Sequence, residues 1–104
     1  MLRTVLEMTV HAGREAEFRA AWLETARAAA RLPGSVAQTL LRDPRRPGVH
    51  MIMADWTDQA SLDAFQRSPE REKLSARLEH FRSAAQKRVF EAVEHVPAHH
   101  NLER

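Results

Sequence analysis

The sequence predicts an α+β domain in which a four-stranded antiparallel sheet carries helices on one face only. Strand-like and helix-like segments alternate in the order β-α-β-β-α-(α)-β. The turn between the second and third strands is short enough for a hairpin. One apolar strand lies at the centre of the pattern. This order is the split β-α-β, ferredoxin-like arrangement, whose helices all lie on the same side of the sheet.

The central apolar strand covers residues 48–56, between the turn 43–48 and the helix-capping pair Thr57-Asp58. Its nearly continuous hydrophobicity indicates a strand that is covered on both faces. Side chains alternate along a strand, so two groups of four residues point to opposite sides. One face carries His50, Ile52, Ala54 and Trp56, and the other carries Val49, Met51, Met53 and Asp55.

Periodicity and capping signals predict the other elements. They are strands 3–10, 35–42 and 86–96 and helices 14–32, 58–67 and 68–82. In the first helix, Trp22 belongs to an apolar stripe at helical spacing and is expected in the core. Ser68 followed by Pro69 is a typical start for the last helix. Residues 1–96 are expected to form one domain, and the polar tail 97–104 is expected to be flexible.

Composition excludes several classes of function. The 104 residues include 16 basic and 14 acidic side chains, and this small excess does not favour nucleic-acid binding. The absence of cysteine excludes disulfides and thiolate chemistry. No metal site is expected, because the spacing of His95, His99 and His100 matches no known ligand set. The chain has neither a signal-peptide pattern nor a membrane span, so we expect a cytoplasmic protein without a membrane partner.

Helices on one face leave the other face of the sheet uncovered, although Met51 and Met53 lie there. An apolar face of this kind has to be buried by a partner. The same face of a second chain is the expected partner, so the sequence predicts a homodimer with packed sheets. Asp55 does not suit a dry interface and is expected at its rim or paired with Arg3 or Arg88.

Three segments also carry a family resemblance. Residues 10–18, 33–42 and 56–65, followed by Ser68-Pro69, resemble the antibiotic biosynthesis monooxygenase family, over nearly the whole chain. Among its members the chain is most similar to the small anthrone oxygenases of aromatic polyketide pathways. The resemblance implies a dimeric α+β barrel that oxidises an anthrone-type polyketide to a quinone with O₂. It also implies that no flavin, haem or metal cofactor is used, and that the pocket lies between helices and sheet.

The resemblance can be carried over residue by residue. The pocket tryptophan of the family corresponds to Trp56, and the aromatic residue of its second helix corresponds to Leu62 or Phe65. The two asparagine positions of related enzymes correspond to Leu6 and Ile52 here. These five residues are the expected substrate-binding set. Because both asparagine positions are apolar, the resemblance does not identify the group that handles the proton.

Two polar residues are the candidate catalytic groups. His50 shares the face of Ile52 and Trp56, and histidine exchanges protons readily near neutral pH. The other interpretation, a strand-end residue at the solvent edge, is the one that the sequence favours for His50. The amide of Gln38 can donate to a ketone oxygen, or it can lie at the sheet edge. Trp56 is either an aromatic wall for a flat ligand or a core residue.

Two functions therefore stay open at this level. The first is a cofactor-independent monooxygenase acting on an aromatic polyketide. The second is a ligand-binding, accessory or cyclase-like protein of such a pathway, which the loss of both asparagines favours.

Overall fold

The computed structural model describes residues 1–98, so most of the predicted flexible tail lies outside the described residues. The elements are β1 (Leu2–Thr9), α1 (Glu15–Ala29), β2 (Ser35–Arg42), β3 (Val49–Trp56), α2 (Gln59–Gln66), α3 (Pro69–Leu78) and β4 (Gln86–Glu91). They follow one another in the order that the sequence predicts. No helix within residues 1–98 is long and apolar enough to cross a membrane.

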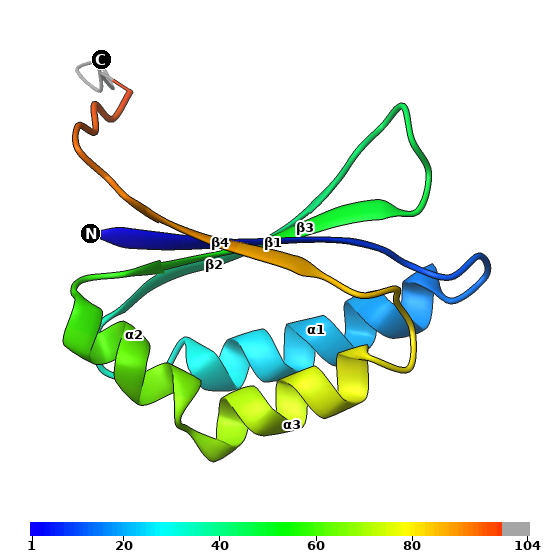
Figure 1. Cartoon of the computed structure of the whole chain (residues 1–104), viewed down its shortest axis with the longest axis horizontal. Helices are drawn as coiled ribbons and strands as arrows, with labels where there is room; N and C mark the ends of the chain where they lie inside the picture. Colours follow the sequence, from blue (N-terminus) through cyan, green and yellow to red (C-terminus); the bar gives the residue numbers. More distant parts are fainter. Residues whose placement is uncertain (99–104) are drawn as a thin grey trace, which may run out of the picture.

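The four strands form one antiparallel sheet in the order β2-β3-β1-β4. Figure 1 shows all three helices on the same side of this sheet. Helices α1 and α3 pack against each other, and α2 lies next to the end of β3. The predicted ferredoxin-like fold is therefore confirmed.

Three elements end several residues earlier than predicted, each for a local reason. Helix α1 ends at Ala29 because tighter turns follow it, with the amides of Arg31 and Leu32 bonded three residues back. Helix α3 ends at Leu78, and the chain then bridges to the end of β1. Strand β4 ends at Glu91, which lies opposite the first residue of β1, Leu2, and one further bond from the Ala92 amide to the Met1 carbonyl brings the chain to the edge of the ladder.

Two clusters of buried residues lie on the helix side of the sheet. The larger one contains Met8, Val10, Phe18, Ala21, Trp22, Ala26, Ile52 and Leu78. The smaller one contains Ala54, Trp56 and Leu62. Strand β3 contributes to both, and its helix-side residues are all buried as the alternation predicts. The predicted core position of Trp22 is also confirmed.

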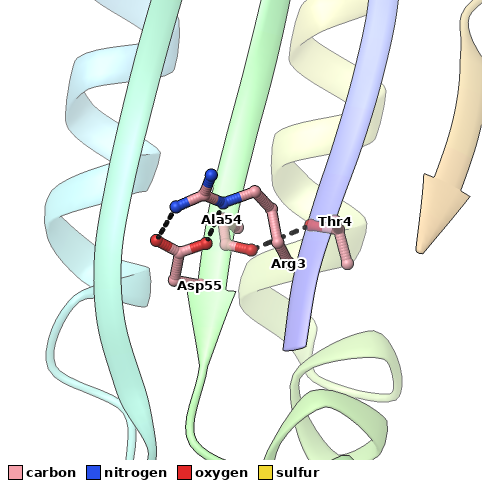
Figure 2. A network of polar contacts seen from close by, with 4 residues as sticks. All are labelled: Arg3, Thr4, Ala54 and Asp55. Atoms are coloured by element: carbon pink, nitrogen blue, oxygen red, sulfur yellow. Dashed lines mark hydrogen bonds and ion pairs between the residues drawn. The ribbon is translucent and has the colours of Figure 1, made fainter. Parts of the chain in front are cut away.

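The opposite face of the sheet has no helix over it (Figure 1). Met51 and Met53 are half-buried there, and Phe90 of β4 is 47% exposed. Asp55 pairs with Arg3, one of the two predicted partners: Nε donates to Oδ1 at 2.7 Å and Nη2 donates to Oδ2 at 3.1 Å (Figure 2). Hydrogen bonding to this carboxylate raises the pKa of the Arg3 guanidinium.

Gly34, in the turn before β2, offers a test of the fold. Its φ of 82° is a left-handed conformation, and a Cβ there would overlap the side chain of Ser61. Gly13 has a similar φ of 81° with no atom within 4 Å of such a Cβ. Alanine at either position incurs the ~1–2 kcal/mol cost of this conformation.

Because only Gly34→Ala adds a steric overlap, we expect it to lower the free energy of unfolding by at least ~1 kcal/mol more than Gly13→Ala. Urea denaturation of the two variants measures this difference. Equal losses would contradict the packing of the turn against α2.

Candidate active site

A cavity of about 90 Å³ that is partly open to the surface lies between the two buried clusters, on the helix side of the sheet. Its apolar wall includes Leu6 of β1, Trp22 of α1, Ile52 and Ala54 of β3, and Leu62 and Phe65 of α2. Residues from both clusters line it, so the cavity is the gap that divides the core. The predicted site residues Leu6, Ile52, Leu62 and Phe65 thus meet in one place.

A pair of stacked aromatic rings closes the α2 end of this cavity. The Phe65 and Trp56 rings stack with centroids 4.8 Å apart and planes inclined by 28°. Phe65 lines the cavity, whereas Trp56 is completely buried behind it. The Trp56 indole N–H has no hydrogen-bond partner among residues 1–98. Of the two interpretations of Trp56, the core position holds, and Phe65 is the aromatic residue that faces the cavity.

Gln38 lies at the rim of the cavity, opposite Ala54 in the β2–β3 register. Its Nε2 donates a long hydrogen bond of 3.3 Å to Ser35 Oγ. A bond of this length is weak, so the amide can turn toward a ligand at little cost. The structure therefore brings Gln38 to the apolar site residues.

His50 lies farther along β3 and does not reach the cavity. Its side chain is 5% exposed, and Nδ1–H donates to the carbonyl of Gly48 at 2.9 Å. The ring packs edge-on against Phe18, with centroids 5.5 Å apart. His50 instead lines a separate, open groove on the surface. Trp22 and Gln38 line both the cavity and this groove, so they separate the two. Strand alternation indicates the correct face, but it does not indicate how far along the strand the cavity extends.

Three cations at the opening of the cavity were not among the expected site residues: Arg71 of α3, Arg82 of the α3–β4 connection, and Lys87 of β4. Among residues 1–98 no acidic side chain lines this cavity. Desolvation lowers the pKa of the Arg82 guanidinium. Desolvation and the charge of Arg71 lower the pKa of Lys87. Alternation places Lys87 on the helix side of β4, whereas no sequence signal points to Arg71 or Arg82.

An apolar cavity between a sheet and its helices, with a few polar groups at its rim, is typical of a protein that binds a small molecule. The chain belongs to the antibiotic biosynthesis monooxygenase family, which it matches over residues 1–92. The family resemblance in the sequence is thereby confirmed.

One curated relative is deoxynogalonate monooxygenase of Streptomyces nogalater, 42% identical over 64 residues, which are 62% of this chain and 51% of the relative. The chain thus spans about half the length of that relative. A solved structure of SnoaB, a cofactor-independent oxygenase from Streptomyces nogalater, superposes with a TM-score of 0.82 and 29% identity, over 93% of this chain and 97% of that one.

A second solved structure has a lower sequence identity. A putative antibiotic biosynthesis monooxygenase from Deinococcus radiodurans has a TM-score of 0.84 and 18% identity, over 96% of this chain and all of that one. At this identity the likeness concerns the fold.

Proposed function

We propose that the protein is a cofactor-independent monooxygenase that oxidises an anthrone-type aromatic polyketide to a quinone with O₂. The observation that carries the proposal is the apolar cavity with an aromatic wall, in a chain of this family. The similarity to an oxygenase described as cofactor-independent supports the lack of a cofactor. The similarity to a monooxygenase acting on deoxynogalonate supports a polyketide substrate.

The proposed reaction converts the central CH₂ of an anthrone to C=O. Loss of a proton gives an electron-rich carbanion, which transfers electrons to O₂ and forms a carbon–oxygen bond. Breaking the O–O bond of the resulting peroxide and losing the second hydrogen leaves the quinone and one water. The substrate thus supplies the electrons, and the protein needs to hold it away from bulk water and stabilise its anion.

The expected site residues other than His50 each have a role in this proposal. Leu6 and Ile52 contact the ring system from the sheet, and Leu62 contacts it from α2. Phe65 stacks on the rings, and Trp56 holds Phe65 in place from behind. Gln38 donates a hydrogen bond to a substrate oxygen at the rim. His50 lies outside the cavity, so this proposal assigns it no role.

The size of the cavity has a consequence for binding. At about 90 Å³ it is smaller than the ~300–1,000 Å³ of most ligand sites. A tricyclic substrate therefore requires the side chains at the opening to move outward. Gln66, Arg71 and Leu74 line this side, where α2 meets α3, and they are the residues that we expect to shift.

The test is oxidation of an anthrone by the purified protein. We expect dithranol in air to give quinone absorbance faster than in buffer. The rate should survive a chelator, and it should vanish when O₂ is removed. A rate equal to that of buffer would contradict the proposal.

The alternative function is a ligand-binding, accessory or cyclase-like protein, and one observation favours it. The two positions that correspond to family asparagines, Leu6 and Ile52, present apolar side chains to the cavity. In that case dithranol would show a spectral change on binding but no turnover.

We further propose that the protein is a homodimer whose uncovered sheet faces pack together, as the half-buried Met51 and Met53 suggest. Light scattering should then give twice the mass of one chain. Met53→Glu should give the mass of one chain, because a carboxylate would be buried in the interface. Leu23→Glu, at an exposed position on α1, is the matched control and should stay dimeric. A wild-type mass of one chain would contradict this assembly.

A further inference from the structure

We propose that Arg71, Arg82 and Lys87, at the opening of the cavity, bind a negatively charged oxygen group of the substrate. This inference rests on the function proposed above and specifies its substrate class. The substrate would be a flat aromatic molecule that carries a carboxylate or an ionised ring hydroxyl at one end. The apolar rings would occupy the inner cavity, and the anionic group would lie at the opening.

The first argument is the balance of charge. Three cations and no acidic side chain of residues 1–98 line the cavity. The ion pairs of the described residues involve other arginines, namely Arg3, Arg14, Arg46 and Arg77. Like charges next to an apolar hollow are weakly screened, so a bound anion would relieve their repulsion.

The second argument is the unsatisfied hydrogen-bond capacity of Arg82. Its Nε is buried and has no partner among residues 1–98, whereas Nη1 donates to the carbonyl of Ser83 at 3.2 Å. A buried guanidinium N–H without an acceptor is unfavourable. An anionic oxygen at the opening would supply the missing acceptor through a charge-assisted hydrogen bond.

The third argument is that the backbone around Arg82 is held in place. The amide of His11 donates to the carbonyl of Phe81 at 2.8 Å, and the amide of Ser83 donates to the carbonyl of Thr9 at 2.8 Å. These bonds flank Arg82 and tie the α3–β4 connection to the end of β1. The guanidinium is therefore presented by a fixed segment, as a binding group requires.

The position of Lys87 completes the cluster. It lies opposite Leu6 in the β1–β4 register, and both residues line the cavity and the depression outside its opening. Glu79 also lines that depression but not the cavity, and desolvation lowers the pKa of Arg82 despite the opposing effect of the Glu79 charge. The cations therefore extend from the apolar interior to the surface, and the acidic group stays outside.

The experiment compares ligands that have the same shape but differ in charge. Anthraquinone-2-carboxylate is compared with anthraquinone-2-carboxamide, and 2-hydroxyanthraquinone with its methyl ether. We expect at least one acidic ligand to bind about ten- to a hundredfold more tightly than its neutral counterpart, as charge-assisted hydrogen bonds allow. The absorbance of bound 2-hydroxyanthraquinone shows whether its hydroxyl is ionised. A preference within the first pair would indicate a carboxylate site, and a preference within the second pair would indicate a phenolate site.

The double variant Arg82→Gln/Lys87→Met should lose this preference and keep its affinity for the neutral ligands. Arg77→Gln removes one charge from α3 outside the cavity and is the matched control, expected to keep the preference. Denaturation curves of each variant verify folding. Equal binding of acidic and neutral ligands by the wild-type protein would overturn the inference.

The outcomes also separate this inference from the proposed function. Preference for an acidic ligand without oxidation of any anthrone would support the anion site and contradict the monooxygenase. Oxidation of dithranol without any preference for an acidic ligand would support the monooxygenase and contradict the anion site.

Discussion

Trp56→Ala is expected to lower the free energy of unfolding by about 3–5 kcal/mol, the usual cost of truncating a buried tryptophan. Trp56 is completely buried, is packed in one cluster with Ala54 and Leu62, and stacks on Phe65. Domains are stable by only about 5–15 kcal/mol, so the variant should be close to unfolding. Urea denaturation followed by circular dichroism measures the loss.

Trp56→Phe is the control for this experiment. Phenylalanine keeps an aromatic ring against Phe65 and removes the indole N–H, which has no partner among residues 1–98. Losing an unsatisfied buried donor partly offsets the smaller buried area, so we expect a clearly smaller loss of stability. An equally stable Trp56→Ala variant would show that this residue is not part of the core.

Ala54→Leu is expected to displace the substrate from the cavity without unfolding the protein. Ala54 lies on the floor of the cavity between Thr4 and Gln38, and both neighbours also line it. Leucine adds three carbon atoms to a space of about 90 Å³. Filling a cavity commonly raises stability by ~0.5–2 kcal/mol. The same filling should lower the rate of anthrone oxidation by about a hundredfold or more, because a displaced substrate reacts poorly.

The measurements are the quinone-forming rate and the denaturation midpoint of the same preparation. Ala76→Leu makes the identical substitution at an exposed position of α3 and should leave the rate unchanged. Full activity of the Ala54→Leu variant would place the substrate elsewhere. The open groove beside His50 would then become the candidate.

Much of the fold is predictable from short-range patterns. The alternation of β3 assigns Ile52, Ala54 and Trp56 to the buried face, and the structure agrees. The cap at Ser68 marks the start of α3, where its side chain accepts a hydrogen bond from the amide of Arg71. These patterns succeed because side-chain direction and helix capping depend on residues only a few positions apart.

The candidate site is only partly predictable. Leu6, Ile52, Leu62 and Phe65 are expected there and do line the cavity. His50 shares their face but lies beyond the end of the cavity, and Trp56 lies behind Phe65. Local patterns do not indicate which of the Trp56 and Phe65 rings faces the cavity, or how far the cavity extends along β3. Both features depend on how α2 packs against the sheet.

The order of the elements, the buried face of β3 and the apolar character of the site follow from the amino-acid sequence alone. Local backbone geometry sets these features, and each can be read within a single element. By contrast, Arg71, Arg82 and Lys87 meet at one opening only because of the way the whole chain folds. They come from a helix, a connection and a strand, and their meeting depends on how the chain folds back to pair β4 with β1.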